Sequence, residues 1–266
     1  MYKIAFIGAG NMASAIANGI ISSKLINAEN IFLYDKNENQ YSKFPSECKY
    51  AANITEICNE SDYIFLSVKP QNIKDVLSEV KSTDTKDKVF VSICAGITIE
   101  SIEQILGKRK IVRTMPNTPM LLGLGVTALC KNDLVSESEF EFVTSLFASS
   151  GDTIELKEDE INAITAVTSS SPAYVYTFIK GMLEGAKSLG LDYDNILDVI
   201  CKTIIGSVHM VLTKEKSVDD LIRMVKSPNG TTERALNVFD ENNFIKTIED
   251  AMIACSNRAE ELAKLN

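Results

Sequence analysis

Histidine is nearly absent: the 266 residues contain one, His209. It lies among apolar residues in the helical stretch 204–212 and has no acidic partner at a regular spacing. We expect a packed or solvent-facing helix residue rather than a catalytic one. Histidine triads and His-ligated metal sites are therefore not expected, and no metal is predicted.

Paired cysteines and an excess of basic residues are also lacking. The six cysteines are scattered without a Cys-x-x-Cys pair, so neither a zinc knuckle nor a redox motif is present. We expect buried free thiols. The formal net charge of −9 argues against nucleic acid as a ligand, because binding a phosphate backbone needs a basic surface.

No run of uncharged apolar residues approaches the length that spans a bilayer. An apolar strand follows the first residues at once and leaves no room for a cleavable signal segment. We therefore expect a cytoplasmic protein without a membrane partner. A chain with 45% hydrophobic and 24% charged residues is typical of a globular protein, and its length suits two domains.

Up to about residue 158, short apolar runs alternate with amphipathic helical patterns. This alternation is typical of βαβ units and predicts an α/β domain over residues 1–158, with a Rossmann-like, doubly wound, mostly parallel sheet. Strands are expected at 3–7, 31–34, 63–67, 89–93, 111–115, 126–130 and 153–156. Helices are expected at 12–23, 54–60, 73–81, 99–106 and 137–148.

Residues 159–266 are predicted to form an all-α domain. Helices are expected at 173–189, 195–213, 218–225, 232–239 and 244–265. The two at 173–189 and 195–213 are apolar around most of their circumference, more than a small domain can cover alone. Dimerisation through these helices is favoured. Contact with a membrane surface is the weaker alternative, because their polar side has no basic face.

A glycine-rich turn predicts a dinucleotide site. Residues 8–13 read Gly-Ala-Gly-Asn-Met-Ala, a G-x-G-x-x-A motif that directly follows a strand and opens a helix. Gly8 permits the tight turn, and Gly10 lets the backbone approach the pyrophosphate. Ala13 allows the helix to pack closely on the strand.

Two neighbouring residues leave the identity of the dinucleotide open. Asp35 ends the second strand, where a carboxylate would accept a hydrogen bond from the ribose 2′-hydroxyl of NADH. Lys36, beside it, would instead accommodate the 2′-phosphate of NADPH. Loops at the ends of later strands complete the predicted cofactor site, which comprises Gly8, Gly10, Asn11, Met12, Ala13, Asp35, Lys36, Val68, Lys69, Pro70, Ala95, Gly96, Met115, Pro116 and Asn117.

The whole sequence resembles the pyrroline-5-carboxylate reductase family. The similarity is carried by Gly-Ala-Gly-Asn-Met-Ala at 8–13, Val-Lys-Pro-Gln at 68–71, Met-Pro-Asn-Thr-Pro at 115–119, Ser-Ser-Pro-Ala-Tyr at 170–174 and Ser-Pro-Asn-Gly-Thr-Thr at 227–232. The resemblance implies a Rossmann domain, an interlocked helical dimerisation domain, and dimers that can assemble further. It also implies reduction of the imine of 1-pyrroline-5-carboxylate to L-proline by NADH or NADPH, the last step of proline biosynthesis.

The resemblance places the substrate, a cyclic imino acid, at Ser227, Pro228, Asn229, Gly230, Thr231 and Thr232, with the Thr232 hydroxyl as the catalytic contact. Physical reasoning agrees, because this segment opens a helix whose free N–H groups suit a carboxylate. The local sequence alone fits a plain turn and helix cap equally well. A cyclic iminium carries its own positive charge, so no strong general base is required.

Some positions depart from the family pattern. Ser169 and Ser171 stand where glycine is common, and positive φ angles there would cost on the order of 1 kcal/mol each. Asn229 also replaces a glycine, but asparagine tolerates the left-handed region. Lys226 stands in place of a serine or threonine, and Lys180 in place of an acid.

Two other functions stay open at this point. A hydroxyacid dehydrogenase of similar build would need a base, for which only Lys180 and Lys187 are available. A non-catalytic, dinucleotide-binding regulatory dimer would bind the cofactor without turnover.

Overall fold

The computed structural model describes residues 2–265, which divide into two compact units. Unit 1 comprises Met1–Pro172 and Ala254–Asn266, and unit 2 comprises Ala173–Ile253. This division follows packing, whereas the predicted boundary between residues 158 and 159 follows the change from strands to helices. The two criteria differ because the first helices after residue 158 pack with the sheet. The predicted division into a cofactor domain, residues 1–158, and a helical substrate and dimerisation domain, residues 159–266, therefore stays a prediction.

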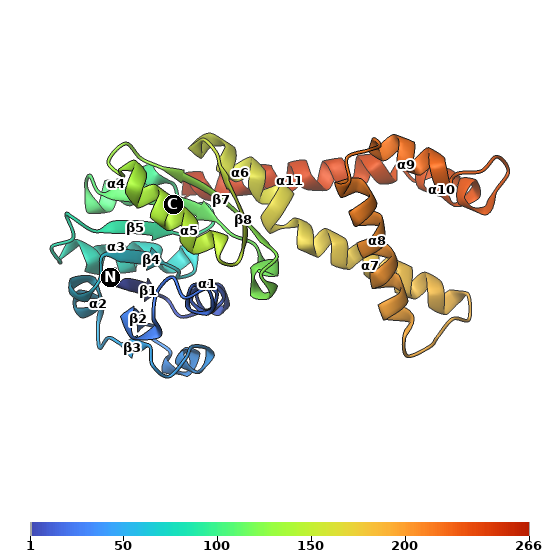
Figure 1. The fold of residues 1–266 in the computed structure, drawn as a ribbon. Coiled ribbons are helices and arrows are strands. Elements are labelled where there is room, and N and C mark those ends of the chain that lie inside the picture. Colours follow the sequence, from blue (N-terminus) through green and yellow to red (C-terminus); the bar gives the residue numbers. More distant parts are fainter. Residues whose placement is uncertain (1, 266) are drawn as a thin grey trace. The chain divides into compact units, whose positions relative to one another are not determined.

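Unit 1 is built on a single mostly parallel sheet (Figure 1). Within residues 2–265 the strand order is β3-β2-β1-β4-β5-β6-β7-β8, and only β6 and β7 pair antiparallel. The predicted doubly wound architecture is confirmed, although the short edge strand β3 was not predicted. The strands are β1 Ile4–Ile7, β2 Ile31–Tyr34, β3 Lys49–Tyr50, β4 Tyr63–Leu66, β5 Val89–Ser92, β6 Lys110–Met115, β7 Gly125–Lys131 and β8 Gly151–Glu155.

Helices cover both faces of this sheet. One face packs against α1 (Asn11–Ser22) and α5 (Glu137–Ala148). The other packs against α2 (Ile54–Glu60), α3 (Ile73–Lys81) and α4 (Ile99–Leu106). The short helix α6 (Ile161–Ile164) continues into a π-helical turn over Thr165–Ser169, and neither was predicted.

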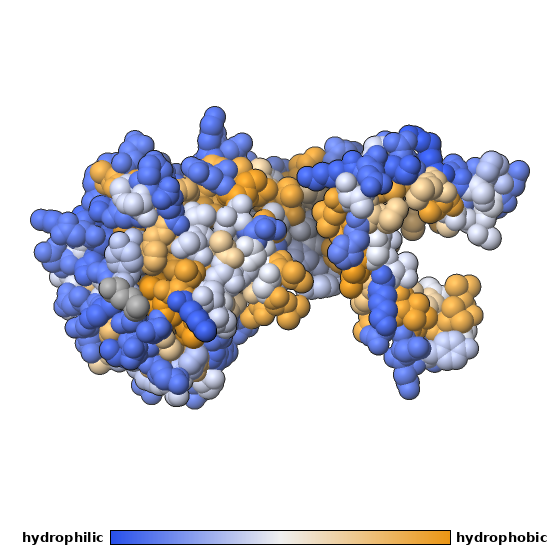
Figure 2. Space-filling model, viewed as in Figure 1, coloured by the Kyte–Doolittle hydropathy of each residue, from blue (hydrophilic) through white to orange (hydrophobic). Residues whose placement is uncertain are grey.

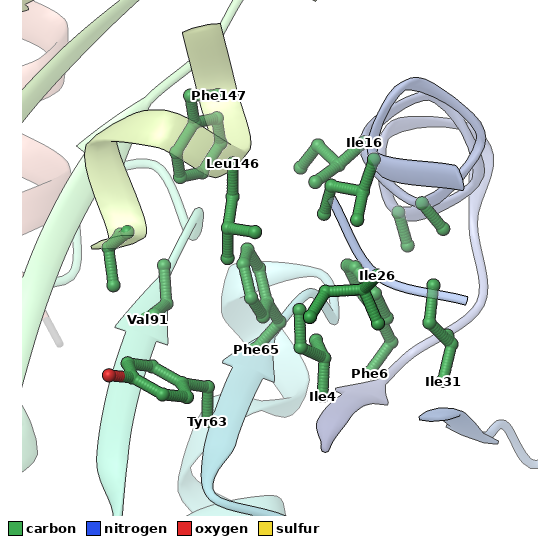
Figure 3. Close-up of a cluster of buried hydrophobic side chains, with 14 of the residues drawn as sticks. Ile4, Phe6, Ile16, Ile26, Ile31, Tyr63, Phe65, Val91, Leu146 and Phe147 are labelled. Atoms are coloured by element: carbon green, nitrogen blue, oxygen red, sulfur yellow. The ribbon is translucent and has the colours of Figure 1, made fainter. Parts of the chain in front are cut away.

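The central strands are apolar throughout because both of their faces are buried. Alternate residues of β1 point to opposite sides, Phe6 into one core cluster and Ile7 into the other. Figure 3 shows Phe6 against Phe65 of β4, with Leu146 of α5 beside them. The two rings stack with their centroids 4.6 Å apart. This packing fixes β1 and β4 side by side, and the glycine turn follows directly from the end of β1.

Unit 2 is helical, as predicted. Many large apolar side chains of unit 2 are exposed, among them Tyr176, Ile205 and Leu212. Figure 2 shows hydrophobic residues on the surface of this unit. No helix within residues 2–265 is both long and apolar enough to cross a membrane. The helices that form or enter this unit are α7 Ser171–Ser188, α8 Ile196–Leu212, α9 Val218–Val225, α10 Thr231–Glu241 and α11 Phe244–Leu265.

Candidate functional site

A cavity of about 500 Å³ opens at the carboxyl ends of β1, β2 and β4. The chain leaves β1 for β2 on one side and β4 lies on the other, so the strand order reverses here. Crevices at such reversals are the usual ligand sites of doubly wound sheets. The cavity gathers seven of the predicted cofactor residues: Gly8, Gly10, Asn11, Asp35, Lys36, Val68 and Lys69.

The two glycines of the turn have different constraints. Gly8 has φ of +101°, and a Cβ there would lie 2.6 Å from the carbonyl oxygen of Ser67. The Ser67 hydroxyl also donates to the Gly8 carbonyl at 2.6 Å. A Cβ on Gly10, in contrast, would meet nothing within 4 Å. Gly8 is therefore required by the fold, whereas Gly10 keeps open the space that a pyrophosphate would use.

The start of α1 suits an anion. Gly10 is its N-cap and provides no side-chain cap, and the first turn contains no acidic residue. The N–H groups of this turn are thus available to a ligand at the positive end of the helix dipole. Met12 and Ala13 do not line the cavity, and Ala13 is buried in the core beneath the turn. Together the open Gly10 and the uncapped helix fit a dinucleotide.

The Asp35 carboxylate links two loops. Its Oδ2 accepts from the Ala9 backbone N–H at 2.7 Å, and its Oδ1 accepts from the Asn37 N–H at 2.8 Å. The Tyr41 hydroxyl accepts from the Asp35 backbone N–H at 3.0 Å. Asp35 thus holds the glycine turn, a role that the sequence did not indicate, and it also lines the cavity; its predicted bond to the ribose stays a prediction.

Sequence reasoning missed two polar residues on the β2 side of the cavity, Gln40 and Lys43. Both lie on a 3₁₀ turn over Glu38–Lys43. The Lys43 Nζ donates to Asn11 Oδ1 at 2.6 Å and to Gln40 Oε1 at 2.5 Å. Lys43 lies outside the G-x-G-x-x-A motif, so only the 3₁₀ turn, once recognised, could have indicated that Lys43 reaches the site.

The remaining predicted cofactor residues, Pro70, Ala95, Gly96, Met115, Pro116 and Asn117, do not line this cavity. Asn117 is buried, donates to the Thr168 carbonyl at 3.1 Å and accepts from the Val126 N–H at 2.9 Å. The Ser169 hydroxyl donates to the Pro116 carbonyl at 3.1 Å. The two bonds that involve Thr168 and Ser169 hold the loop after β6 against the π-helical turn. The cofactor role of the six residues stays a prediction.

Ser169, Ser171 and Asn229 stand where the family commonly has glycine, and only Asn229 has a positive φ angle. Among the described residues, positive φ at non-glycine positions occurs at Lys24, Lys214, Asn229 and Asn243 only, so Ser169 and Ser171 are unstrained. Asn229 has φ of 56°, in the left-handed region that asparagine tolerates. Ser169 and Ser171 therefore impose no backbone cost on the site.

The predicted substrate loop lies in unit 2 and is largely exposed. Helix α10 begins at Thr231, one residue earlier than predicted, so Thr232 is its second residue. Gly230 at the N-cap provides no side-chain cap. The Asn229 N–H is taken by the Glu233 carboxylate at 2.8 Å. Among residues 2–265 the Thr232 hydroxyl has no hydrogen-bond partner, so it does not act as a helix cap and is free to contact a ligand.

No metal centre is evident in the part of the chain that the structure describes, where no three His, Cys, Asp or Glu side chains are grouped to hold an ion.

Family models match both parts of the chain. One described as pyrroline-5-carboxylate reductase dimerisation matches residues 158–262, and one described as NADP oxidoreductase, coenzyme F420-dependent, matches residues 3–96. The chain is 35% identical to the pyrroline-5-carboxylate reductase of Escherichia coli (strain K12), over 98% of both chains. It is 37% identical to that of Pseudomonas aeruginosa, over 98% of this chain and 97% of the relative.

Solved structures agree. The fold is similar to that of a Plasmodium falciparum pyrroline carboxylate reductase with NADP bound, with a TM-score of 0.91, 32% identity and coverage of 98% of both chains. A pyrroline-5-carboxylate reductase from Coxiella burnetii gives a TM-score of 0.86 at 33% identity, again over 98% of both chains. The likeness therefore extends through both units.

The two glycines give a matched pair of variants. Gly10→Val is expected to abolish dinucleotide binding and to cost only about 1 kcal/mol of stability, because its side chain enters open space at a helix N-cap. Gly8→Ala is expected to destabilise the fold by at least about 1–3 kcal/mol, since it combines positive φ with a backbone clash. Cofactor titration and chemical unfolding measure the two effects. Unchanged dinucleotide affinity in Gly10→Val would place the pyrophosphate elsewhere.

Proposed function

Since this chain belongs to the pyrroline-5-carboxylate reductase family, we propose that it transfers a hydride from NADH or NADPH to the imine of 1-pyrroline-5-carboxylate, giving L-proline. The observation that carries this proposal is the open Gly10 turn above the uncapped start of α1, in a chain that matches such reductases over 98% of its length. This reaction is the last step of proline biosynthesis.

The protein's contribution is binding and orientation. The bound nicotinamide supplies the hydride, and the ring nitrogen of the substrate gains or already carries a proton. Because the cyclic iminium is cationic, a positioned pocket suffices and a strong base is unnecessary. In our proposal the backbone N–H groups at the start of α10 hold the substrate carboxylate. The free Thr232 hydroxyl bonds the substrate and assists proton delivery.

The competing functions have less support. A hydroxyacid dehydrogenase needs a base that is neutral at the working pH, and a lysine gains that property by burial or beside another cation. Lys180 and Lys187 are both exposed on α7. A regulatory dimer without turnover is tested directly by the assay below.

We also propose that residues 1–158 bind the cofactor and that residues 159–266 bind the substrate and form a homodimer. A cavity of about 830 Å³ in unit 2 supports dimerisation, because its lining is almost entirely apolar and includes Phe178, Phe239 and Phe244. A chain working alone would expose this surface to water. Such dimers can assemble further.

A cytoplasmic location is part of the proposal. Four cysteines are buried free thiols, as predicted, and Cys201 and Cys255 are partly buried. Burial raises the pKa of Cys94 to about 12, so its thiol stays protonated near neutral pH. Free thiols in this number are typical of a reducing compartment.

The function is tested by adding 1-pyrroline-5-carboxylate to the purified chain and reduced nicotinamide cofactor. We expect the near-ultraviolet absorbance of the reduced cofactor to fall and L-proline to form in equal amount. Cofactor binding without turnover would instead support the regulatory dimer.

In the same assay, Thr232→Ala is expected to lower kcat/KM by roughly one to two decades, the effect of losing one hydrogen bond to a charged group. Its stability should hardly change, because the hydroxyl makes no bond within the described chain. Ser217→Ala is the matched control, since Ser217 caps α9 through the Asp220 N–H at 3.1 Å. The control should lose about 1 kcal/mol of stability and keep its kinetics. A Thr232→Ala variant with normal kcat/KM would show that the Thr232 hydroxyl does not contact the substrate.

Light scattering tests the dimer. The wild-type chain should have the mass of two chains at low micromolar concentration, and Ile205→Asp on α8 should shift it towards one chain. The physical reason is that Ile205 is 55% exposed in the single chain, and burying an aspartate in a dimer contact would be costly. A wild-type chain that is monomeric and active would contradict this proposal.

A further inference from the structure

The predicted substrate loop, residues 227–232, is held in its conformation by the Glu233 carboxylate. The Oε2 atom of Glu233 accepts from the Asn229 backbone N–H at 2.8 Å. The Gly230 N–H donates to the Ser227 carbonyl at 2.9 Å, so both N–H groups just before α10 are used within the loop. The N–H groups of the first turn of α10, in contrast, have no acceptor within the helix itself. The loop is therefore preorganised with these groups directed to a ligand.

Holding the loop with an acid has an electrostatic disadvantage. Glu233 is the third residue of α10, so its negative charge lies beside the same N–H groups that would hold the substrate carboxylate. An acid in the first turn stabilises a helix, but it repels a second anion at the same place. An unpaired Glu233 carboxylate would therefore weaken the binding of an anionic substrate.

Lys226 offsets this charge. Its Nζ lies 3.5 Å from Glu233 Oε1, whereas Asn229 bonds the other carboxylate oxygen. The side chains of Lys226 and Glu233 are 38% and 30% exposed, so water and salt screen the pair only in part. Arg234, the next residue of α10, points to another side of the helix and forms no ion pair among residues 2–265. Lys226 is thus the cation that pairs with Glu233 in the described chain.

We propose that Lys226 is a specificity-determining residue: by neutralising Glu233, it allows the loop that Glu233 holds to accept a substrate with a carboxylate. The proposal rests on the proposed function, in which the start of α10 binds the carboxylate of 1-pyrroline-5-carboxylate. Neither side chain touches the reacting atoms in this proposal. Glu233 fixes the loop, and Lys226 cancels the charge of Glu233. Loss of the Lys226 ammonium should therefore raise KM and leave kcat almost unchanged.

The test measures KM and kcat for 1-pyrroline-5-carboxylate at a saturating concentration of reduced nicotinamide cofactor. Lys226→Met removes the ammonium and keeps an apolar stem, and we expect it to raise KM by about three- to tenfold. Lys226→Arg should keep most of the wild-type KM, because a cation remains beside Glu233. The matched control is Lys108→Met, which removes a lysine that forms a 2.6 Å ion pair with Glu103 in unit 1. Its KM should equal that of the wild type.

Two further measurements distinguish charge compensation from a purely structural role of Lys226. Glu233→Gln removes the negative charge and keeps an oxygen that can accept from the Asn229 N–H. Combining Lys226→Met with Glu233→Gln should therefore return KM to within about twofold of the wild type. Raising the salt concentration from about 0.1 M to about 1 M should also reduce the KM ratio between Lys226→Met and the wild type, because salt screens the repulsion.

An unchanged KM in Lys226→Met would overturn the proposal and leave the reductase intact. A raised KM that neither salt nor Glu233→Gln corrects would do the same, since it would assign Lys226 a structural role. A folded wild-type chain that binds the cofactor and does not reduce this imine would overturn the proposed function itself.

Discussion

The cofactor site depends on one close backbone approach, that of Gly8 at the end of β1 to Ser67 at the end of β4. A Cβ on Gly8 would lie 2.6 Å from the Ser67 carbonyl oxygen, so only glycine fits. The Ser67 hydroxyl and the Asp35 carboxylate then fix the turn from β4 and from β2. The core stacking of Phe6 on Phe65 holds the same two strands in register. A side chain that separated β1 from β4 would therefore disrupt the crevice itself.

Much of the sheet domain could be predicted because its signals are local. Strands buried on both faces are continuous apolar runs, and the G-x-G-x-x-A turn identifies its own strand and helix. Lys43 could not be predicted, since its place in the site depends on a 3₁₀ turn that folds back towards Asn11. Asn117 was predicted to bind the cofactor, and that role stays a prediction; its amide bonds Thr168, 51 residues away in the sequence, and Val126, nine residues away. Side-chain direction at strand ends is set by such distant contacts.

The chemistry of an imine explains why the chain needs no catalytic histidine. A hydride acceptor that is already cationic needs no strong base, and the single histidine, His209, is exposed on α8. What the two proposed sites offer instead are anion-binding groups: in unit 1, lysines and the start of α1 without a side-chain cap, and in unit 2, the start of α10 without a side-chain cap. Recognition of anions by the backbone N–H groups of a helix start is therefore the common feature of both proposed sites.

Direct hydride transfer to the imine carbon is the central claim, and isotope transfer tests it most directly. The purified chain would be given cofactor deuterated at the transferring position of the nicotinamide together with 1-pyrroline-5-carboxylate, and the product would be analysed by mass spectrometry and NMR. The account predicts L-proline with one deuterium on the ring carbon that was double-bonded to nitrogen. Unlabelled proline, or deuterium at another carbon, would contradict it.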